Sequence, residues 1–112
     1  MTTNLLTLSR DQRLAGRTAI VTGSSSGIGE AIAHVLAASG AHVVVHGRDV
    51  GRAEAVAAAI ADGGGAASVV TGDLADSPAA ARAFAAQATE ALGGRVDVLV
   101  NNAGIFPIGP TP

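Results

Sequence analysis

The chain has 112 residues, of which 48% are hydrophobic and 2% aromatic, and a formal net charge of −2 at pH 7. That length suffices for one domain with a modest core of Ala, Val, Ile and Leu, and the charge offers no basic surface for nucleic acid. The absence of cysteine excludes disulfides and thiolate metal sites, and no segment reaches the roughly 18 apolar residues of a membrane span.

Residues 1–15 are predicted to be an N-terminal extension that precedes a single domain over residues 16–112. The extension carries a weak apolar patch at Leu5, Leu6 and Leu8, but it lacks the basic-then-apolar layout of a secretory signal. We therefore expect a cytoplasmic protein with no membrane partner.

A glycine-rich turn follows a short buried strand that is predicted at residues 18–21. Its sequence, from Thr22 to Gly29, is Thr-Gly-Ser-Ser-Ser-Gly-Ile-Gly. Gly23 and Gly27 can adopt positive φ and let a ligand approach the backbone, while Gly29 would let the next helix pack tightly on the strand. A strand, a glycine turn and a helix place backbone N–H groups and a helix N-terminus against a phosphate. We therefore predict a bound dinucleotide.

The rest of the chain alternates between predicted helices and strands. Helices are expected at residues 28–39, 50–61 and 78–92, and strands at residues 41–46, 67–70 and 96–100. Gly40 should cap the first helix at its C-terminus, and Ser77 and Pro78 should start the third. The apolar face of the first helix consists of Ile28, Ile32, Val35 and Leu36; the faces expected to be buried in the other two consist of Ala53, Val56, Ala57 and Ile60, and of Ala81, Phe84, Ala85, Ala88 and Leu92.

This alternation predicts an α/β fold with a parallel sheet and right-handed crossovers. In the order typical of dinucleotide-binding sheets, the strands would run 3-2-1-4. The fold would then be a Rossmann-type doubly wound sheet, truncated after its fourth strand. The loops after Val21 and Val100 would meet at the switch point between the first and fourth strands.

Three histidines, His34, His42 and His46, are scattered along the chain without a convincing metal-ligand arrangement. His42 and His46 share one face of the strand predicted at residues 41–46. Histidines in strands are more often partly exposed or hydrogen-bonded than bound to a metal, so we expect no metal site.

Three motifs at the ends of predicted strands resemble those of the short-chain dehydrogenases/reductases. They are the Thr-Gly-x-x-x-Gly-x-Gly loop at residues 22–29, Asp73 after the third strand, and Asn-Asn-Ala-Gly at residues 101–104 after the fourth. The resemblance covers residues 16–108. One glycine-rich loop alone is a weak signal, but three motifs in the right order form a strong one.

The resemblance implies a set of cofactor-binding residues. Those around the pyrophosphate are Gly23, Ser24, Ser25, Ser26, Gly27, Ile28 and Gly29, those at the adenine are Asp73 and Leu74, and those beside the adenosine ribose and the nicotinamide are Asn101, Ala103 and Gly104. Asn102 would help to hold the central strands. The residues alone leave open a turn before a helix for Asp73, and ordinary turn chemistry for Asn101 and Asn102.

The choice of cofactor can be argued from charge at the end of the second strand. A ribose with free hydroxyls is usually bound by an acid about 20 residues past the glycines, and here that position is Gly47, followed by Arg48. A guanidinium can bind a 2′-phosphate in bidentate fashion, whereas an acid would repel it, so we predict NADP(H). Asp49 keeps NAD as an alternative. Ser26 stands where the family's NADP enzymes have a second basic residue, and the plain alternative for Arg48 is a solvated loop charge.

The catalytic groups of the family have no counterpart in the chain. In the family the chemistry is carried by a serine, a Tyr-x-x-x-Lys pair and usually an asparagine, but this sequence contains no tyrosine and no lysine. We therefore predict no catalytic residue. The apolar run of Val96, Val98, Leu99 and Val100 would form a bare sheet edge, and residues 105–108 would have lined the substrate side.

These expectations favour the N-terminal, cofactor-binding part of a longer oxidoreductase. The resemblance implies that such a parent transfers hydride between NADP(H) and an alcohol or ketone, acts on a small-molecule alcohol or carbonyl substrate, and is a homo-oligomer. The oligomeric state of this chain stays open. The alternative is a free-standing, non-catalytic dinucleotide-binding module, while a P-loop protein is disfavoured because its motif needs a lysine.

Overall fold

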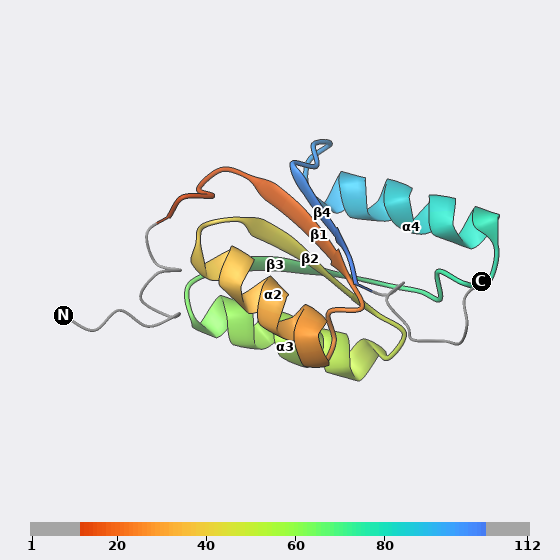
Figure 1. Ribbon diagram of the computed structural model, residues 1–112, viewed down its shortest axis with the longest axis horizontal. Helices are drawn as coiled ribbons and strands as arrows, with labels where there is room; N and C mark the ends of the chain where they lie inside the picture. The colour runs from red at the N-terminus through yellow and green to blue at the C-terminus, as the bar shows by residue number, and fades with distance from the viewer. Residues whose placement is uncertain (1–11, 103–112) are drawn as a thin grey trace.

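The computed structural model describes residues 12–102. In this part of the chain, strands and helices alternate (Figure 1), in the order β1 (Thr18–Thr22), α2 (Gly27–Ala38), β2 (His42–Gly47), α3 (Val50–Asp62), β3 (Ala66–Thr71), α4 (Pro78–Ala91) and β4 (Val98–Asn101). The four strands form one parallel sheet in the order β3-β2-β1-β4. The predicted α/β fold and strand order are confirmed.

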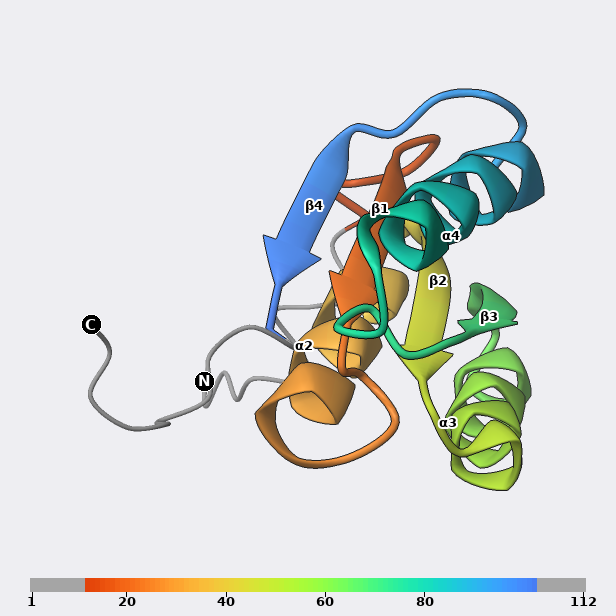
Figure 2. The ribbon, with the colours of Figure 1, turned by 90° about the vertical axis from the view of Figure 1, so that its right-hand side faces the viewer.

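Helices cover both faces of the sheet, α2 and α3 on one side and α4 on the other (Figure 2). Because successive strand residues point to opposite faces, the strands contribute to two apolar clusters. The cluster under α2 and α3 contains Ala19, Val21, Ala33, Ala37, Ala41, Val43, Val45, Ala53, Val56 and Ile60, and the cluster under α4 contains Ile20, Val44, Val70, Phe84, Ala88 and Leu92. Within residues 12–102, no helix has the length and apolarity to cross a bilayer.

The packed face of α2 differs from the predicted one. Its buried residues are Gly29, Ala33 and Ala37, whereas Ile28 is 74% exposed. A Cβ at position 29 would run into the carbonyl of Gly23, so the helix and the glycine turn lie too close for a side chain there. The small residues therefore make the central contact with the sheet, and the larger apolar residues flank it.

The other two helices follow the prediction more closely. The expected residues that are buried in α3 and α4 are Ala53, Val56, Ile60, Phe84 and Ala88. Ala85 is exposed, contrary to the prediction, because α4 buries only every fourth residue along a narrow stripe. The predicted start of this helix is confirmed: Pro78 is its first residue, and the hydroxyl of Ser77 accepts a hydrogen bond from the Ala80 amide at 3.0 Å.

Strand β4 begins at Val98, two residues later than predicted. Its pairing with β1 starts with Ala19 opposite Val98, and Val96 lies before it, 37% exposed. Leu99 pairs with Ile20 and therefore faces the α4 side of the sheet. It is 65% exposed because α4 does not extend over β4 (Figure 2).

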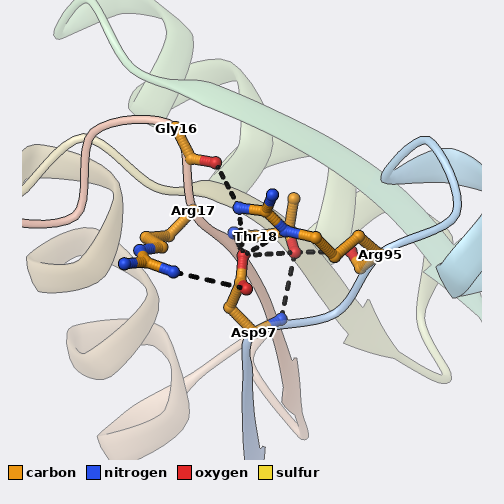
Figure 3. A network of polar contacts seen from close by, with 5 residues as sticks. All are labelled: Gly16, Arg17, Thr18, Arg95 and Asp97. Carbon is orange, nitrogen blue, oxygen red and sulfur yellow. Dashed lines mark hydrogen bonds and ion pairs between the residues drawn. The ribbon is translucent and has the colours of Figure 1, made fainter.

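A network of polar contacts joins β4 to β1 at the amino end of the sheet (Figure 3). Asp97 Oδ2 accepts hydrogen bonds from the Thr18 amide at 2.9 Å and from Arg95 Nη2 at 3.0 Å, and Arg17 Nη1 lies 3.8 Å from Asp97 Oδ1. The hydrogen bonds from the Arg95 side chain, and next that from the Thr18 amide, hold the pKa of Asp97 below its ordinary value. This network therefore fixes the amino end of the outer strand β4 to that of its neighbour β1.

Candidate functional site

The carboxyl ends of the four parallel strands bring the predicted site residues to one edge of the sheet. The glycine turn follows β1, Arg48 follows β2, Asp73 follows β3, and Asn101 ends β4. β1 lies between β2 and β4, so the glycine turn sits at the point where the chain changes direction across the sheet. In open α/β sheets, ligands bind in the crevice at this switch point.

The glycine turn leaves its outer side free. Gly23 and Gly27 have φ angles of 64° and 63°, a backbone conformation that favours glycine. A Cβ at Gly27 would meet nothing within 4 Å. Ser26, the N-cap of α2, makes no side-chain cap hydrogen bond, unlike the N-caps of α3 and α4, whose side chains accept bonds from Arg52 N and Ala80 N. The first turn of α2 thus has no side-chain cap and can receive an anion.

The three serines of the turn lie in different environments. Ser24 is fully buried, and its hydroxyl donates to the Val21 carbonyl at 2.7 Å and accepts from the His46 amide at 2.8 Å. The Ser24 hydroxyl therefore holds the turn from inside. Ser25 is half-buried, with its side chain against Gly47 at the end of β2, and Ser26 is exposed.

His46 lies directly beneath the turn, and the sequence did not single it out as a site residue. Its Nδ1 accepts a hydrogen bond from the Gly23 amide at 2.8 Å, and its Nε2 lies 2.8 Å from the Gly72 carbonyl. The ring also packs edge-on against Phe84 of α4, with centroids 4.7 Å apart. The expectation of hydrogen-bonded histidines is met here and at His42, whose Nε2 lies 2.8 Å from Ser68 Oγ. The sequence indicates the location of His46 through its position, since it ends the strand predicted at residues 41–46 and directly precedes Gly47.

Arg48 and Asp73 face each other at the carboxyl ends of the neighbouring strands β2 and β3. Arg48 Nη1 lies 3.7 Å from Asp73 Oδ2, and the two side chains are 77% and 47% exposed. An exposed pair of this kind contributes little to stability. Asp73 Oδ1 also accepts a hydrogen bond from the Ala75 amide at 2.9 Å. Asp73 therefore forms a turn, which was the alternative to an adenine-binding role for this residue. Leu74 packs partly against the apolar cluster under α4.

The end of β4 is tied to the glycine turn. Asn102 Nδ2 donates to the Gly23 carbonyl at 3.0 Å, and the Thr22 hydroxyl lies 3.3 Å from Asn101 Oδ1. These contacts agree with the holding role that was expected of Asn102. Ala103 and Gly104 lie outside the described residues.

Two other features of the described chain lie away from this edge. Residues 12–102 contain no cluster of three or more His, Asp or Glu side chains that could hold a metal ion. A hollow of about 920 Å³ lies between α2 and α3, where residues such as Gly40, Ala41 and Gly65 line it at the amino ends of β2 and β3. None of the predicted site residues lines this hollow.

Comparison with known proteins identifies relatives of the chain. The sequence model for short chain dehydrogenases matches residues 17–112. The oxidoreductase UcpA of Salmonella typhimurium is 40% identical over 97 residues, which is 87% of this chain. A hydroxysteroid dehydrogenase from Escherichia coli is similar in structure over 86% of this chain, with a TM-score of 0.77 and 42% identity. A metagenomic short-chain oxidoreductase in complex with NADP is similar over 86%, with a TM-score of 0.76 and 47% identity.

The chain is much shorter than these relatives. It spans 36% of the length of UcpA, 38% of the Escherichia coli hydroxysteroid dehydrogenase and 42% of the metagenomic oxidoreductase.

Proposed function

The chain belongs to the short-chain dehydrogenase family, and we propose that it binds NADP(H) at the carboxyl end of its sheet, as the cofactor-binding portion of an oxidoreductase. The observation that carries this proposal is the glycine turn. Two glycines with positive φ lead into a helix whose N-cap forms no side-chain hydrogen bond, and the space outside Gly27 is open. This arrangement fits a pyrophosphate, which needs close backbone approach and N–H donors.

Each loop at the site edge has a proposed role. The backbone of Gly23, Gly27, Ile28 and Gly29 and the hydroxyls of Ser25 and Ser26 would surround the pyrophosphate, with Ser24 bracing the turn from inside through its bonds to Val21 and His46. Asp73 and Leu74 would lie at the adenine. Asn101, Ala103 and Gly104 would lie beside the ribose and nicotinamide.

Arg48 is the residue on which the preference for NADP(H) rests. Its guanidinium is exposed at the end of β2 and can bind a 2′-phosphate with paired hydrogen bonds. The acid that would favour NAD is less available: Asp49 caps α3, its Oδ1 accepting from the Arg52 amide at 3.0 Å. The NADP complex of the metagenomic relative, 47% identical, supports the same choice.

The substitution Arg48→Ala tests this preference. We expect it to weaken NADPH binding by about 1.5–3 kcal/mol, the range for hydrogen bonds to charged groups, and to leave NADH binding nearly unchanged. Fluorescence titration with both cofactors measures the two affinities. Arg82→Ala, which removes an exposed arginine from α4, is the matched control and should change neither. Equal losses of NADPH and NADH binding for Arg48→Ala would overturn the role of Arg48.

The chemistry of the whole protein is also part of the proposal. When bound, NADP(H) supplies or takes up a hydride, and the substrate would be a small-molecule alcohol or carbonyl compound. The sequence has no tyrosine and no lysine, so the proton-transferring groups of the family would come from outside these 112 residues. The chain itself would bind and orient the cofactor.

The intact mass of the protein from its native source tests this part. A mass well above 10.8 kDa supports the cofactor-binding portion of a longer oxidoreductase. A mass of 10.8 kDa would contradict it, and would leave a free-standing dinucleotide-binding module unless a second chain supplied the tyrosine and lysine.

A further inference from the structure

We propose that His46 is a positioning residue that holds the two halves of the dinucleotide site together, using a single neutral form of its ring. One half is the glycine turn after β1, and the other is the turn after β3 that begins at Gly72. This inference rests on the proposed function, because it assigns a role within the same site.

The hydrogen bonds of the His46 ring specify its protonation. The Gly23 amide can only donate, so Nδ1, at 2.8 Å, must accept and carries no proton. The Gly72 carbonyl can only accept, so Nε2, at 2.8 Å, must carry a proton and donate it. Both contacts are made together only by the neutral ring with its proton on Nε2.

The position of His46 lets it link loops from two different strands. β2 lies between β1 and β3 in the sheet, and the ring reaches to one side for Gly23 and to the other for Gly72. The backbone follows the same pattern: the Ser24 amide donates to the His46 carbonyl at 2.7 Å, and the Gly72 amide donates to the Gly47 carbonyl at 3.3 Å. The ring therefore sets the spacing between the two turns.

The ring is held firmly in this place. His46 is 3% exposed, and Phe84 of α4 packs against it at 63° between ring planes. Among the described residues, every buried polar side-chain atom has a hydrogen-bond partner. A replacement that cannot accept from Gly23 or donate to Gly72 would leave a backbone group without a partner in a closed environment, and the turn would shift to regain one.

Both bonds act on groups of the proposed site. Gly23 begins the positive-φ turn that would receive the pyrophosphate, and its carbonyl is bound by Asn102. Gly72 directly precedes Asp73, the residue proposed at the adenine. A change in the His46 ring should therefore alter cofactor affinity, and a purely structural role would alter only stability.

Three substitutions separate the two bonds. His46→Phe keeps the ring but removes both bonds. His46→Asn places an amide oxygen near the position of Nδ1 and can accept from Gly23, while His46→Gln places an amide group near the position of Nε2 and can donate to Gly72. His42→Phe is the matched control, because His42 lies on the same strand and bonds Ser68 near the opposite end of the sheet.

We expect His46→Phe to weaken NADPH binding on the order of tenfold, since it leaves buried backbone groups unpaired. His46→Asn should recover most of the affinity, because the bond to the glycine turn matters most, and His46→Gln should not. His42→Phe should lower the thermal midpoint without changing NADPH affinity. If His46→Phe does not fold, the difference in NADPH affinity between His46→Asn and His46→Gln tests the inference.

Nitrogen-15 NMR of the ring in the unsubstituted protein gives an independent readout. We expect a neutral ring with its proton on Nε2 at neutral pH. A proton on Nδ1, or equal NADPH affinity in folded His46→Phe, His46→Asn and His46→Gln, would overturn the inference. If the unsubstituted protein binds no nicotinamide dinucleotide, the proposed function fails, and the NMR result shows separately whether the ring bridges the two turns.

Discussion

At the residue scale, the contact between Gly47 and Ser25 limits what can stand at the end of β2. A Cβ at Gly47 would meet the side chain of Ser25, so a carboxylate cannot be introduced there without moving the glycine turn. The position that usually carries the ribose-binding acid is thus closed to a longer side chain by the contact with Ser25.

This contact makes a prediction about cofactor choice when Ser25 is first replaced by glycine. In the Ser25→Gly background, adding Gly47→Asp should lower the ratio of NADPH to NADH affinity by about fivefold or more, because two like charges about 4 Å apart repel by about 1 kcal/mol in water and about 4 kcal/mol near a protein surface. Adding Gly47→Ala instead should leave the ratio unchanged, since it adds bulk without charge. Titration with both cofactors measures the ratio, and an equal effect of Ala and Asp would contradict the electrostatic argument.

Asp97 makes a second prediction at this scale, on stability against pH. Hydrogen bonds from Arg95, and next from the Thr18 amide, lower its pKa below the ordinary value of 3.8. The folded state therefore binds the carboxylate's proton less readily than the unfolded state. The stabilisation is fully present above the ordinary value and is lost as the pH falls through the lowered folded value.

We expect Asp97→Asn to remove part of this acid sensitivity. The urea midpoint of the unsubstituted chain should fall between neutral pH and about pH 3, and the midpoint of Asp97→Asn should start lower and fall less. Asp62→Asn, at the exposed end of α3, is the control and should keep the unsubstituted slope. Identical pH profiles for Asp97→Asn and the unsubstituted chain would show that the network around Asp97 does not contribute to the loss of stability in acid.

At the scale of elements, α2 packs on the sheet through small residues. Ala33 is completely buried, and the adjacent turn of the helix presents Gly29 to the glycine turn. Small residues let the helix axis lie close to β1, which keeps the N-terminus of α2 beside the end of that strand. The close approach is therefore required both by the core and by the proposed phosphate site.

Ala33→Leu tests this close packing. Three extra carbon atoms in a filled contact should lower the free energy of unfolding by about 1–3 kcal/mol. Ile28→Ala, on the same helix but at a residue that is 74% exposed, should change it by no more than about 0.5 kcal/mol. Urea denaturation measures the free energy of unfolding of both variants. A larger loss for Ile28→Ala than for Ala33→Leu would contradict packing through the small residues and favour the predicted apolar face.

The elements could be predicted from the sequence because turn residues and apolar runs mark them locally. The strand order followed from the alternation of strands and helices, and the cap at Ser77 from its neighbour Pro78. The packed face of α2 could not be predicted, because periodicity gives weight to large residues such as Ile28 and little to alanine. The role of His46 was also hidden, since its two ring partners lie 23 and 26 residues away in the chain.

At the scale of the whole molecule, the two faces of the sheet are covered unequally. α2 and α3 lie on one face, and Val98 and Val100 of β4 pack partly beneath them. α4 lies on the other face, over the side of the sheet that includes β3 (Figure 2). Leu99, on that face of the outer strand β4, is left 65% exposed.

This uneven cover predicts self-association of the 112-residue chain. An outer strand with an exposed apolar side chain offers both unpaired backbone groups and apolar surface to a second copy. We expect Leu99→Lys to lower the self-association measured by sedimentation velocity, because a lysine on an outer strand opposes strand-to-strand pairing. Val50→Lys replaces a 51% exposed apolar residue at the start of α3, a helix that lies beside β3 at the opposite edge of the sheet from β4 (Figure 2), and should leave association unchanged. An equal decrease in both variants would point to net charge as the cause, and no decrease in Leu99→Lys would show that the face of β4 is not the contact surface.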